Sequence, residues 1–263
     1  MSDWRSYDNV AETYERVHAP RFAEVARDLA SLAGAGPGAR VLDVGTGTGV
    51  AAEAAADAGA LAVGIDPAAG MLIVGSRARP GVRFAAAEAI DLPFRDGTFD
   101  AVVGNFVVGH FTKYKTALFD MVRVLRPSGR LAVSAWADER DSLQETWLSV
   151  AESVAPRGVL RSAIADGYPW GERFTRAENL DQALRDAGLT RVRIERREFR
   201  FRYGLDEYVD GLATFTIGRF LRDMLGEEGW SSFVVRARQA FAERFSDPLN
   251  DFRQANLAVG TRP

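Results

Sequence analysis

Short apolar runs alternate with segments of helical character through the first half of the chain. Five runs typical of buried strands, each bounded by Gly, Pro or Asp, lie at 39–45, 60–66, 82–87, 99–106 and 129–136. Three segments between them are long enough for crossover helices: 49–59, 68–78 and 114–126. Repeated strand–helix–strand units predict an α/β fold with a doubly wound, mostly parallel sheet, whose ligands lie beyond the carboxyl ends of the strands.

The pattern changes after Trp136. Aromatic residues are spaced irregularly over 138–175, and 176–189 is typical of an amphipathic helix that ends at Gly188. Residues 191–203 alternate apolar and charged side chains, as a strand with one solvated face does, and 252–261 can pair with them as a hairpin. The intervening segment holds two helical stretches, which predicts a cap and not a long structureless loop.

We therefore expect three parts. A helical lid covers 1–38, the cofactor-binding core comprises 39–137, 176–203 and 252–263, and cap insertions that bind the substrate occupy 138–175 and 204–251.

Composition narrows the class of protein. The chain has 263 residues, is 47% hydrophobic and carries a net charge of -3, so it can bury a large core and has no overall field that attracts nucleic acid. The absence of cysteine excludes disulfides, thiolate zinc sites and a cysteine nucleophile. No stretch has the length and apolarity of a signal peptide or a membrane span. We expect a cytoplasmic monomer or homodimer without a metal or a membrane partner.

A glycine-rich turn follows the first strand. In "VLDVGTGTG", residues 41–49, Gly45, Gly47 and Gly49 allow a ligand to approach the backbone and leave N–H groups free at the start of a helix. The dinucleotide pattern G-x-G-x-x-G is not met, because Val50 stands where its third glycine belongs, and no lysine of a phosphate-binding loop follows. The spacing favours a smaller, nucleoside-like ligand, although such turns also occur for packing reasons.

Two acids extend this nucleoside hypothesis. Asp66 ends the second strand, where a carboxylate can accept hydrogen bonds from both ribose hydroxyls, or can cap the following helix. Glu88 ends the third strand, where it can accept the adenine amino group beside the backbone N–H of Ala89, or can be a solvated loop acid. Met71 and Ile90 can supply apolar contacts to the adenine ring.

Four segments, in this order and spacing, resemble the class I S-adenosylmethionine-dependent methyltransferases that act on small molecules: "VLDVGTGTG", "GIDPAAGML", "AEAIDLPFRDGTFDAVV" and "VRVLRPSGRLAVSAW". The resemblance covers residues 5–136 and the terminal hairpin, and implies a Rossmann-like seven-stranded sheet with the last strand antiparallel and S-adenosyl-L-methionine as cofactor. At the third-strand loop the family often has Gly-Asp-Ala, where this chain has Ala87, Glu88 and Ala89.

The resemblance also implies the cofactor contacts. By position these are Tyr14 in the segment that folds over the cleft; Asp43, Gly45, Thr46, Gly47 and Gly49 on the methionine and ribose side; Asp66 and Met71 at ribose and adenine; Glu88 and Ala89 at the adenine edge; and Asn105 at the methionine moiety.

His110 is the candidate catalytic base. It lies in "NFVVGHF", on the loop after the fourth strand, where the resemblance also favours a histidine near the reacting methyl. A loop histidine that merely packs against a neighbour is the alternative. The acceptor pocket is expected to be aromatic, unless the same side chains form the small core of the cap. Its candidate substrate-binding residues are Tyr7, His18, Trp136, Trp147, Trp170, Phe215 and Phe220.

The sequence thus predicts a methyltransferase that acts on a small, partly hydrophobic or aromatic metabolite, of the specialised-metabolite or quinone-precursor type. Two alternatives stay open: a protein of the same fold that uses the cleft for another reaction, such as a cyclisation, and a non-catalytic binding protein. The acceptor atom, whether O, N or C, is not defined by these patterns.

Overall fold

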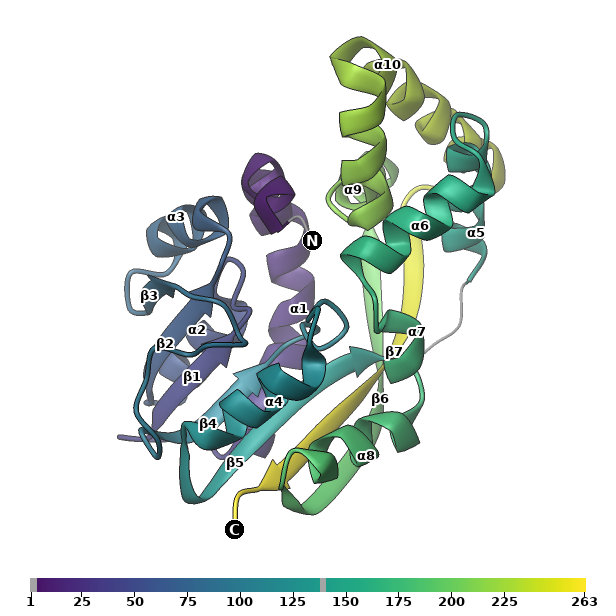
Figure 1. The fold of residues 1–263 in the computed structure, drawn as a ribbon. Coiled ribbons are helices and arrows are strands. Elements are labelled where there is room, and N and C mark those ends of the chain that lie inside the picture. Colours follow the sequence, from purple (N-terminus) through teal and green to yellow (C-terminus); the bar gives the residue numbers. More distant parts are fainter. Residues whose placement is uncertain (1–3, 138–140) are drawn as a thin grey trace.

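The computed structural model describes residues 4–137 and 141–263 and contains one seven-stranded sheet (Figure 1). The strand order is β3-β2-β1-β4-β5-β7-β6. β7 runs antiparallel to both of its neighbours, β5 and β6, and the pairs among β1 to β5 are parallel. The strands are β1 (Arg40–Val44), β2 (Leu61–Asp66), β3 (Arg83–Ala86), β4 (Phe99–Gly104), β5 (Leu125–Trp136), β6 (Thr190–Tyr203) and β7 (Leu249–Thr261). The predicted fold class is confirmed, and the terminal hairpin is the β6–β7 pair.

Helices cover both faces of the sheet. On one face lie α1 (Ala11–Ala33) and α2 (Val50–Asp57), and on the other lie α4 (Tyr114–Arg123) and α8 (Ala177–Asp186), as Figure 1 shows. α3 (Ala69–Ala78) packs near the 3-10 helix η1 (Trp4–Val10). Leu42 of β1 and Leu131 of β5 are fully buried, because strands covered on both sides need continuous apolar runs.

One predicted boundary is wrong. The helix expected over 114–126 ends at Arg123, and β5 already begins at Leu125. Leu125 is fully buried and pairs with Phe99 of β4. Pro127 disfavours helical backbone at the residue before it, so the chain leaves the helix sooner than its apolar spacing suggests.

The remaining helices build the cap. α5 (Ser142–Glu152), α6 (Arg157–Gly167), α9 (Leu205–Ala213) and α10 (Thr216–Arg244) gather beyond the ends of β6 and β7 (Figure 1). They share an apolar core that includes Trp147, Phe233 and Phe241, whereas the short α7 (Gly171–Phe174) packs against the sheet. The two helical stretches expected at 205–225 and 230–245 are helical, but their boundaries differ: the first is interrupted after Ala213, and its second part continues into α10, with non-helical backbone at Gly226. No helix in the described ranges has the length and apolarity needed to cross a membrane.

The N-terminal segment divides into two parts. Val25, Ala26 and Leu29, in the second half of α1, are fully buried in the same apolar cluster as β4 and β5. Only η1 and the first half of α1 contribute side chains to the large cavity described below, through Trp4, Tyr7, Tyr14 and Phe22. The segment expected to be a lid is therefore partly a core helix of the sheet.

Candidate active site

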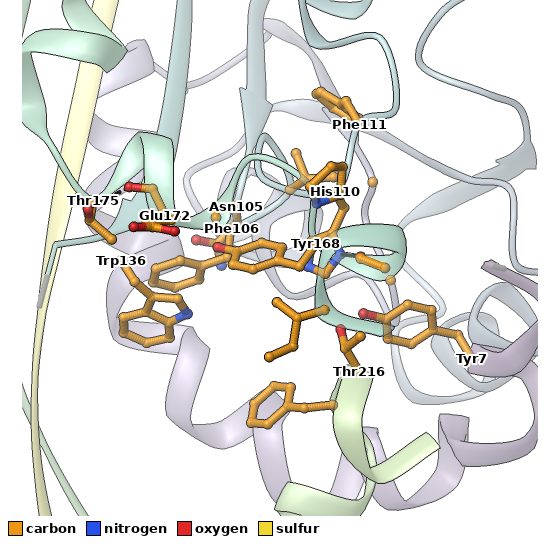
Figure 2. A pocket seen from close by; sticks show the side chains of 18 of the residues that line it. Tyr7, Asn105, Phe106, His110, Phe111, Trp136, Tyr168, Glu172, Thr175 and Thr216 are labelled. Carbon is orange, nitrogen blue, oxygen red and sulfur yellow. Dashed lines mark hydrogen bonds between the residues drawn. The ribbon is translucent and has the colours of Figure 1, made fainter. Parts of the chain in front are cut away.

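A cavity of about 2280 Å³ lies at the carboxyl ends of the central strands. Its wall is formed by the loops after β1, β2, β3 and β4, by η1 and α1, and by cap residues from α5, α6 and the start of α10. This is the end of a doubly wound sheet at which ligands bind. Figure 2 shows labelled side chains from η1, from the loop after β4, from the end of β5, from the segment after α6 and from the start of α10 around one space.

The glycine turn forms the floor of this cavity. Gly45 and Gly47 line it, with φ values of 68° and 56° in the left-handed region that favours glycine. A Cβ on Gly45 would overlap a methyl group of Val107, and one on Gly47 would lie 3.3 Å from Met71 Cε and 3.9 Å from Tyr14 Cε1. Met71 and Tyr14 also line the cavity, so a side chain at Gly47 would narrow its floor.

Asp66 holds the glycine turn and also faces the cavity. Its two carboxylate oxygens accept hydrogen bonds from the backbone N–H of Gly47 and of Ala68, each at 2.9 Å. A carboxylate oxygen can accept a second hydrogen bond, so ligand hydroxyls can still be bound. Burial raises the pKa of Asp66 to about 6, while the two N–H donors oppose that rise.

Asp43, Thr46 and Gly49 are not among the lining residues of the cavity. Asp43 is 1% exposed and accepts hydrogen bonds from Thr46 Oγ1 at 2.6 Å and from the N–H of Ala52 at 3.0 Å. Burial raises its pKa to about 7. These residues lie beneath the floor and fix the shape of the turn. The other predicted cofactor residues do line the cavity: Tyr14, Gly45, Gly47, Asp66, Met71, Glu88, Ala89 and Asn105.

This floor fits a nucleoside ligand. It combines a side-chain-free backbone at Gly45 and Gly47, a carboxylate with free lone pairs at Asp66, and the acid Glu88 further along the same wall. Carboxylates at the ends of successive strands suit ribose hydroxyls and an exocyclic amine.

His110 lines the cavity as a neutral imidazole. Its Nδ1 lies 3.0 Å from the carbonyl oxygen of Gly167. Because a carbonyl can only accept, Nδ1 carries the proton and Nε2 keeps its lone pair. Burial lowers the pKa of His110 to about 4, the Gly167 hydrogen bond opposes this, and the charge of Arg219 lowers it further. The centroid of the His110 ring lies 4.5 Å from that of Tyr168 and 6.3 Å from that of Tyr7. Figure 2 labels the three side chains.

A flat aromatic wall stands beside Asn105. The rings of Phe106 and Trp136 are stacked, with centroids 4.0 Å apart and an interplanar angle of 16° (Figure 2). Phe106 adopts a positive φ of 54°, which is uncommon for a bulky residue. Ser134 holds this conformation, because its Oγ accepts from the Phe106 N–H at 2.8 Å and donates to Asn105 Oδ1 at 2.7 Å. Phe106 and Trp136 both line the cavity, so this part of its wall is apolar and aromatic.

Some of the residues predicted to bind the acceptor line the cavity, and others do not. Tyr7, Trp136, Trp147 and Phe215 line the cavity. His18, Trp170 and Phe220 do not, so the expectation that they line the acceptor pocket is corrected here.

Each of the three packs elsewhere. His18 is 1% exposed, with Nε2 2.8 Å from Thr214 Oγ1 and 3.1 Å from the Gly211 carbonyl, and so joins α1 to the end of α9. Trp170 packs edge-on against Tyr114 at 4.8 Å, and Phe220 packs against the cap core. Residue type marked these positions as candidates, but their partners are set by tertiary packing.

Several cavity residues carry no motif that sequence reasoning could use. Phe106 lies on the loop after β4, and the others lie in or next to the cap helices and α7: Tyr168, Glu172, Thr175, Thr216 and Arg219. The packing of these helices brings the latter residues to the cavity.

Comparisons with known proteins agree with this geometry. The methyltransferase domain family matches residues 42–133. The demethylmenaquinone methyltransferase of Renibacterium salmoninarum is 41% identical over 207 residues, which cover 70% of this chain and 85% of that protein.

Solved structures share the fold. Haemonchus contortus phosphoethanolamine N-methyltransferase 2, in complex with phosphomonomethylethanolamine and S-adenosylhomocysteine, has a TM-score of 0.61 at 16% identity over 100% of this chain and 61% of that one. The [4+2]-cyclase SpnF has a TM-score of 0.56 at 22% identity over 91% of this chain and 81% of that one. The fold alone thus accommodates more than one reaction.

Proposed function

Since this chain belongs to the class I S-adenosylmethionine-dependent methyltransferases, with S-adenosylmethionine as its cofactor, we propose that its acceptor is a small aromatic metabolite of the quinone-precursor type. The acceptor enters as a phenol or hydroquinone, because the oxidised quinone ring is itself an electrophile and cannot attack a methyl donor. The demethylmenaquinone methyltransferase named above supports this acceptor class.

One observation carries the proposal: the glycine turn with Asp66 and the stacked Phe106–Trp136 wall belong to a single continuous cavity. Its volume of about 2280 Å³ exceeds the several hundred cubic ångströms of a typical single-ligand site. There is room for the cofactor at the turn and for a planar acceptor against the aromatic wall. Thus both reactants can lie side by side.

Different residues would bind different parts of the cofactor. Asp66 would hold the ribose, Glu88 with Ala89 the adenine edge, and Gly45 with Gly47 the amino-acid end of the cofactor. When bound, the cofactor supplies a methyl group on an activated sulfonium. The protein therefore mainly aligns the acceptor and excludes water, and such positioning can contribute roughly 7–11 kcal/mol to lowering a barrier.

His110 is the candidate proton acceptor. Methyl transfer to a phenolic oxygen or to its neighbouring ring carbon releases one proton from the acceptor. The Nε2 lone pair of His110 is available throughout the neutral range, because the pKa of this histidine is lowered to about 4. With such a low pKa, His110 would accept a hydrogen bond from the acceptor hydroxyl and would transfer the released proton to bulk water instead of retaining it.

The proposal is tested by incubating the protein with methyl-labelled S-adenosylmethionine and a panel of acceptors. The panel holds a reduced 2-prenyl-1,4-naphthoquinone, simple phenols, amines and activated carbon acids. We expect label in the naphthohydroquinone and little in the amines. Cofactor binding without transfer to any member would contradict the proposed acceptor class and favour a non-methylating use of the cleft.

A further inference from the structure

Arg219, in the first turn of α10, is a buried cation in the cavity wall. Its side chain is 7% exposed, and it lines the same cavity as His110 and Asp66. Burying a guanidinium away from water is unfavourable unless an anion or several hydrogen bonds compensate for the lost hydration. The partners of Arg219 therefore show whether the protein itself compensates for this charge.

Every partner of Arg219 in the described part of the chain is neutral. Nε donates to Ser6 Oγ at 2.8 Å, and Nη1 donates to the carbonyl oxygen of Thr214. The guanidinium carbon lies 3.7 Å from the centroid of the Tyr7 ring. None of the ion pairs among the described residues includes Arg219.

Arg79 provides the contrast within the same molecule. It is also 7% exposed, yet its guanidinium pairs with Glu15 at 2.9 Å and with Glu53 at 2.8 Å. Arg79 does not line the cavity. Arg79, which is buried within the protein, is thus neutralised by two carboxylates. Arg219, which is buried against the ligand cavity, pairs with none, and its Nη2 group makes no hydrogen bond to the described residues.

The position of Arg219 places it between the two halves of the cavity. The Tyr7 ring that it covers lies 6.3 Å from His110 and 6.4 Å from Tyr14, and Tyr14 lies against Gly47. Figure 2 shows Tyr7 and Thr216 facing the space next to His110. An anion that reaches Arg219 can thus belong to a ligand on the turn side or on the acceptor side.

We propose that Arg219 is an anion-binding residue of the cavity, whose guanidinium binds an oxyanion of a bound ligand. The oxyanion is either the carboxylate of the cofactor or the phenolate of the acceptor. This inference rests on the proposed function for which ligands enter the cavity. A phenolate bound in this way would be held next to His110 in its more nucleophilic form.

The test is calorimetric titration with two ligand pairs that differ by one negative charge. The first pair is S-adenosylhomocysteine and its analogue without the α-carboxylate. The second pair is 2-hydroxy-1,4-naphthoquinone, an anion at neutral pH, and its neutral 2-methoxy ether. We expect the wild-type protein to prefer the charged member of one pair by about tenfold or more, as hydrogen bonds to a charged group contribute in proteins. The pair that shows this preference identifies the source of the oxyanion.

Variants separate anion binding from a structural tether. Arg219→Gln should abolish the preference, and Arg219→Lys should reduce it, because a lysine keeps the charge but loses the planar fork. Arg222→Gln is the matched control on the same helix, since Arg222 pairs with the exposed Glu227 and does not line the cavity. It should leave the preference unchanged.

Two results would overturn the proposal: no charge preference in either pair with wild-type protein, or a preference that Arg219→Gln leaves unchanged. If Arg219→Gln fails to fold, Arg219→Met, which keeps an unbranched apolar stem but removes the charge, takes its place, and an undiminished preference in that variant has the same meaning. A wild-type protein that does not bind S-adenosylhomocysteine would count against the proposed function instead, and the naphthoquinone pair would still decide the role of Arg219.

Discussion

Replacing Asp66 with alanine should weaken cofactor binding strongly while leaving the free protein nearly as stable as before. In the structure this carboxylate accepts two backbone hydrogen bonds and faces the cavity floor. Its remaining lone pairs are those assigned to the ribose hydroxyls. The substitution removes these acceptors without placing a larger side chain in the cavity.

The size of the binding effect follows from the hydrogen bonds lost. A hydrogen bond to a charged group contributes about 1.5–3 kcal/mol, and about 1.4 kcal/mol corresponds to a tenfold change in affinity. Loss of one ribose hydrogen bond should therefore raise the dissociation constant at least about tenfold. Loss of both should raise it roughly a hundredfold or more.

The effect on folding contains two opposing parts. The N–H groups of Gly47 and Ala68 lose their acceptor, at about 1 kcal/mol each. Against this, burial raises the pKa of Asp66 to about 6 even with these two hydrogen bonds in place, so the ionised carboxylate is unfavourable in the native state at neutral pH. Alanine removes that unfavourable charge. Because the two parts act in opposite directions, the melting temperature of the free protein should change by only a few degrees.

The assay is titration of S-adenosylhomocysteine by calorimetry, with thermal unfolding of the free protein measured in parallel. Asp57→Ala, an exposed acid at the end of α2 that is remote from the lining residues, is the control and should match the wild type. Unchanged affinity in Asp66→Ala would refute the ribose assignment. A large loss of stability together with the loss of affinity would refute the separation of the two effects.

Three further predictions follow from the same geometry. His110→Phe should lower turnover about a hundredfold or more while S-adenosylhomocysteine affinity is retained, and an unchanged rate would contradict the role of His110 in proton transfer. Cofactor affinity should fall as the pH drops through about 6, because protonated Asp66 loses acceptor capacity. Calorimetry should show that Asp66→Asn lacks this pH dependence. If the pH dependence persists in that variant, another group causes it. Gly45→Ala should lower the free energy of unfolding by about 1–3 kcal/mol in denaturant titrations, since the φ of Gly45 is 68° and a Cβ would overlap Val107. Gly36→Ala, with open space around it, is the control and should not lower it. Equal stability of the two variants would contradict the strain at Gly45.

The sheet and the glycine turn were predictable because their causes are local. Buried parallel strands need continuous apolar residues, and the tight turn after β1 needs the positive φ that Gly45 and Gly47 adopt. Asp66 follows from the same logic, since the end of β2 must lie beside the end of β1 in this sheet. The spacing of these residues along the chain was therefore enough to predict where the part of the cavity proposed for the cofactor lies.

The acceptor half depends on packing between distant segments. Arg219 is one of many arginines in the chain, and only the fold of α10 against η1 brings it to Tyr7 and the cavity. Phe106 faces Trp136 because the hydroxyl of Ser134 holds its unusual backbone conformation. His18 seemed equally suitable for a cavity, but Thr214 binds it in the interior instead. No periodicity or motif encodes such pairings.

The buried hydrogen bond of His18 also connects the two parts of the cavity, those proposed for the cofactor and for the acceptor. One helical turn before His18, Tyr14 borders the cofactor floor at Gly47. At the other end of its hydrogen bond, Thr214 precedes Phe215 and Thr216, which line the part of the cavity proposed for the acceptor. Because burial lowers the pKa of His18 to about 3, this link keeps one protonation state throughout the neutral range. α1 thus connects the turn proposed to receive the methyl donor to the cap segment proposed to receive the acceptor. A helix that itself belongs to the core of the sheet would therefore set the distance between the two reactants.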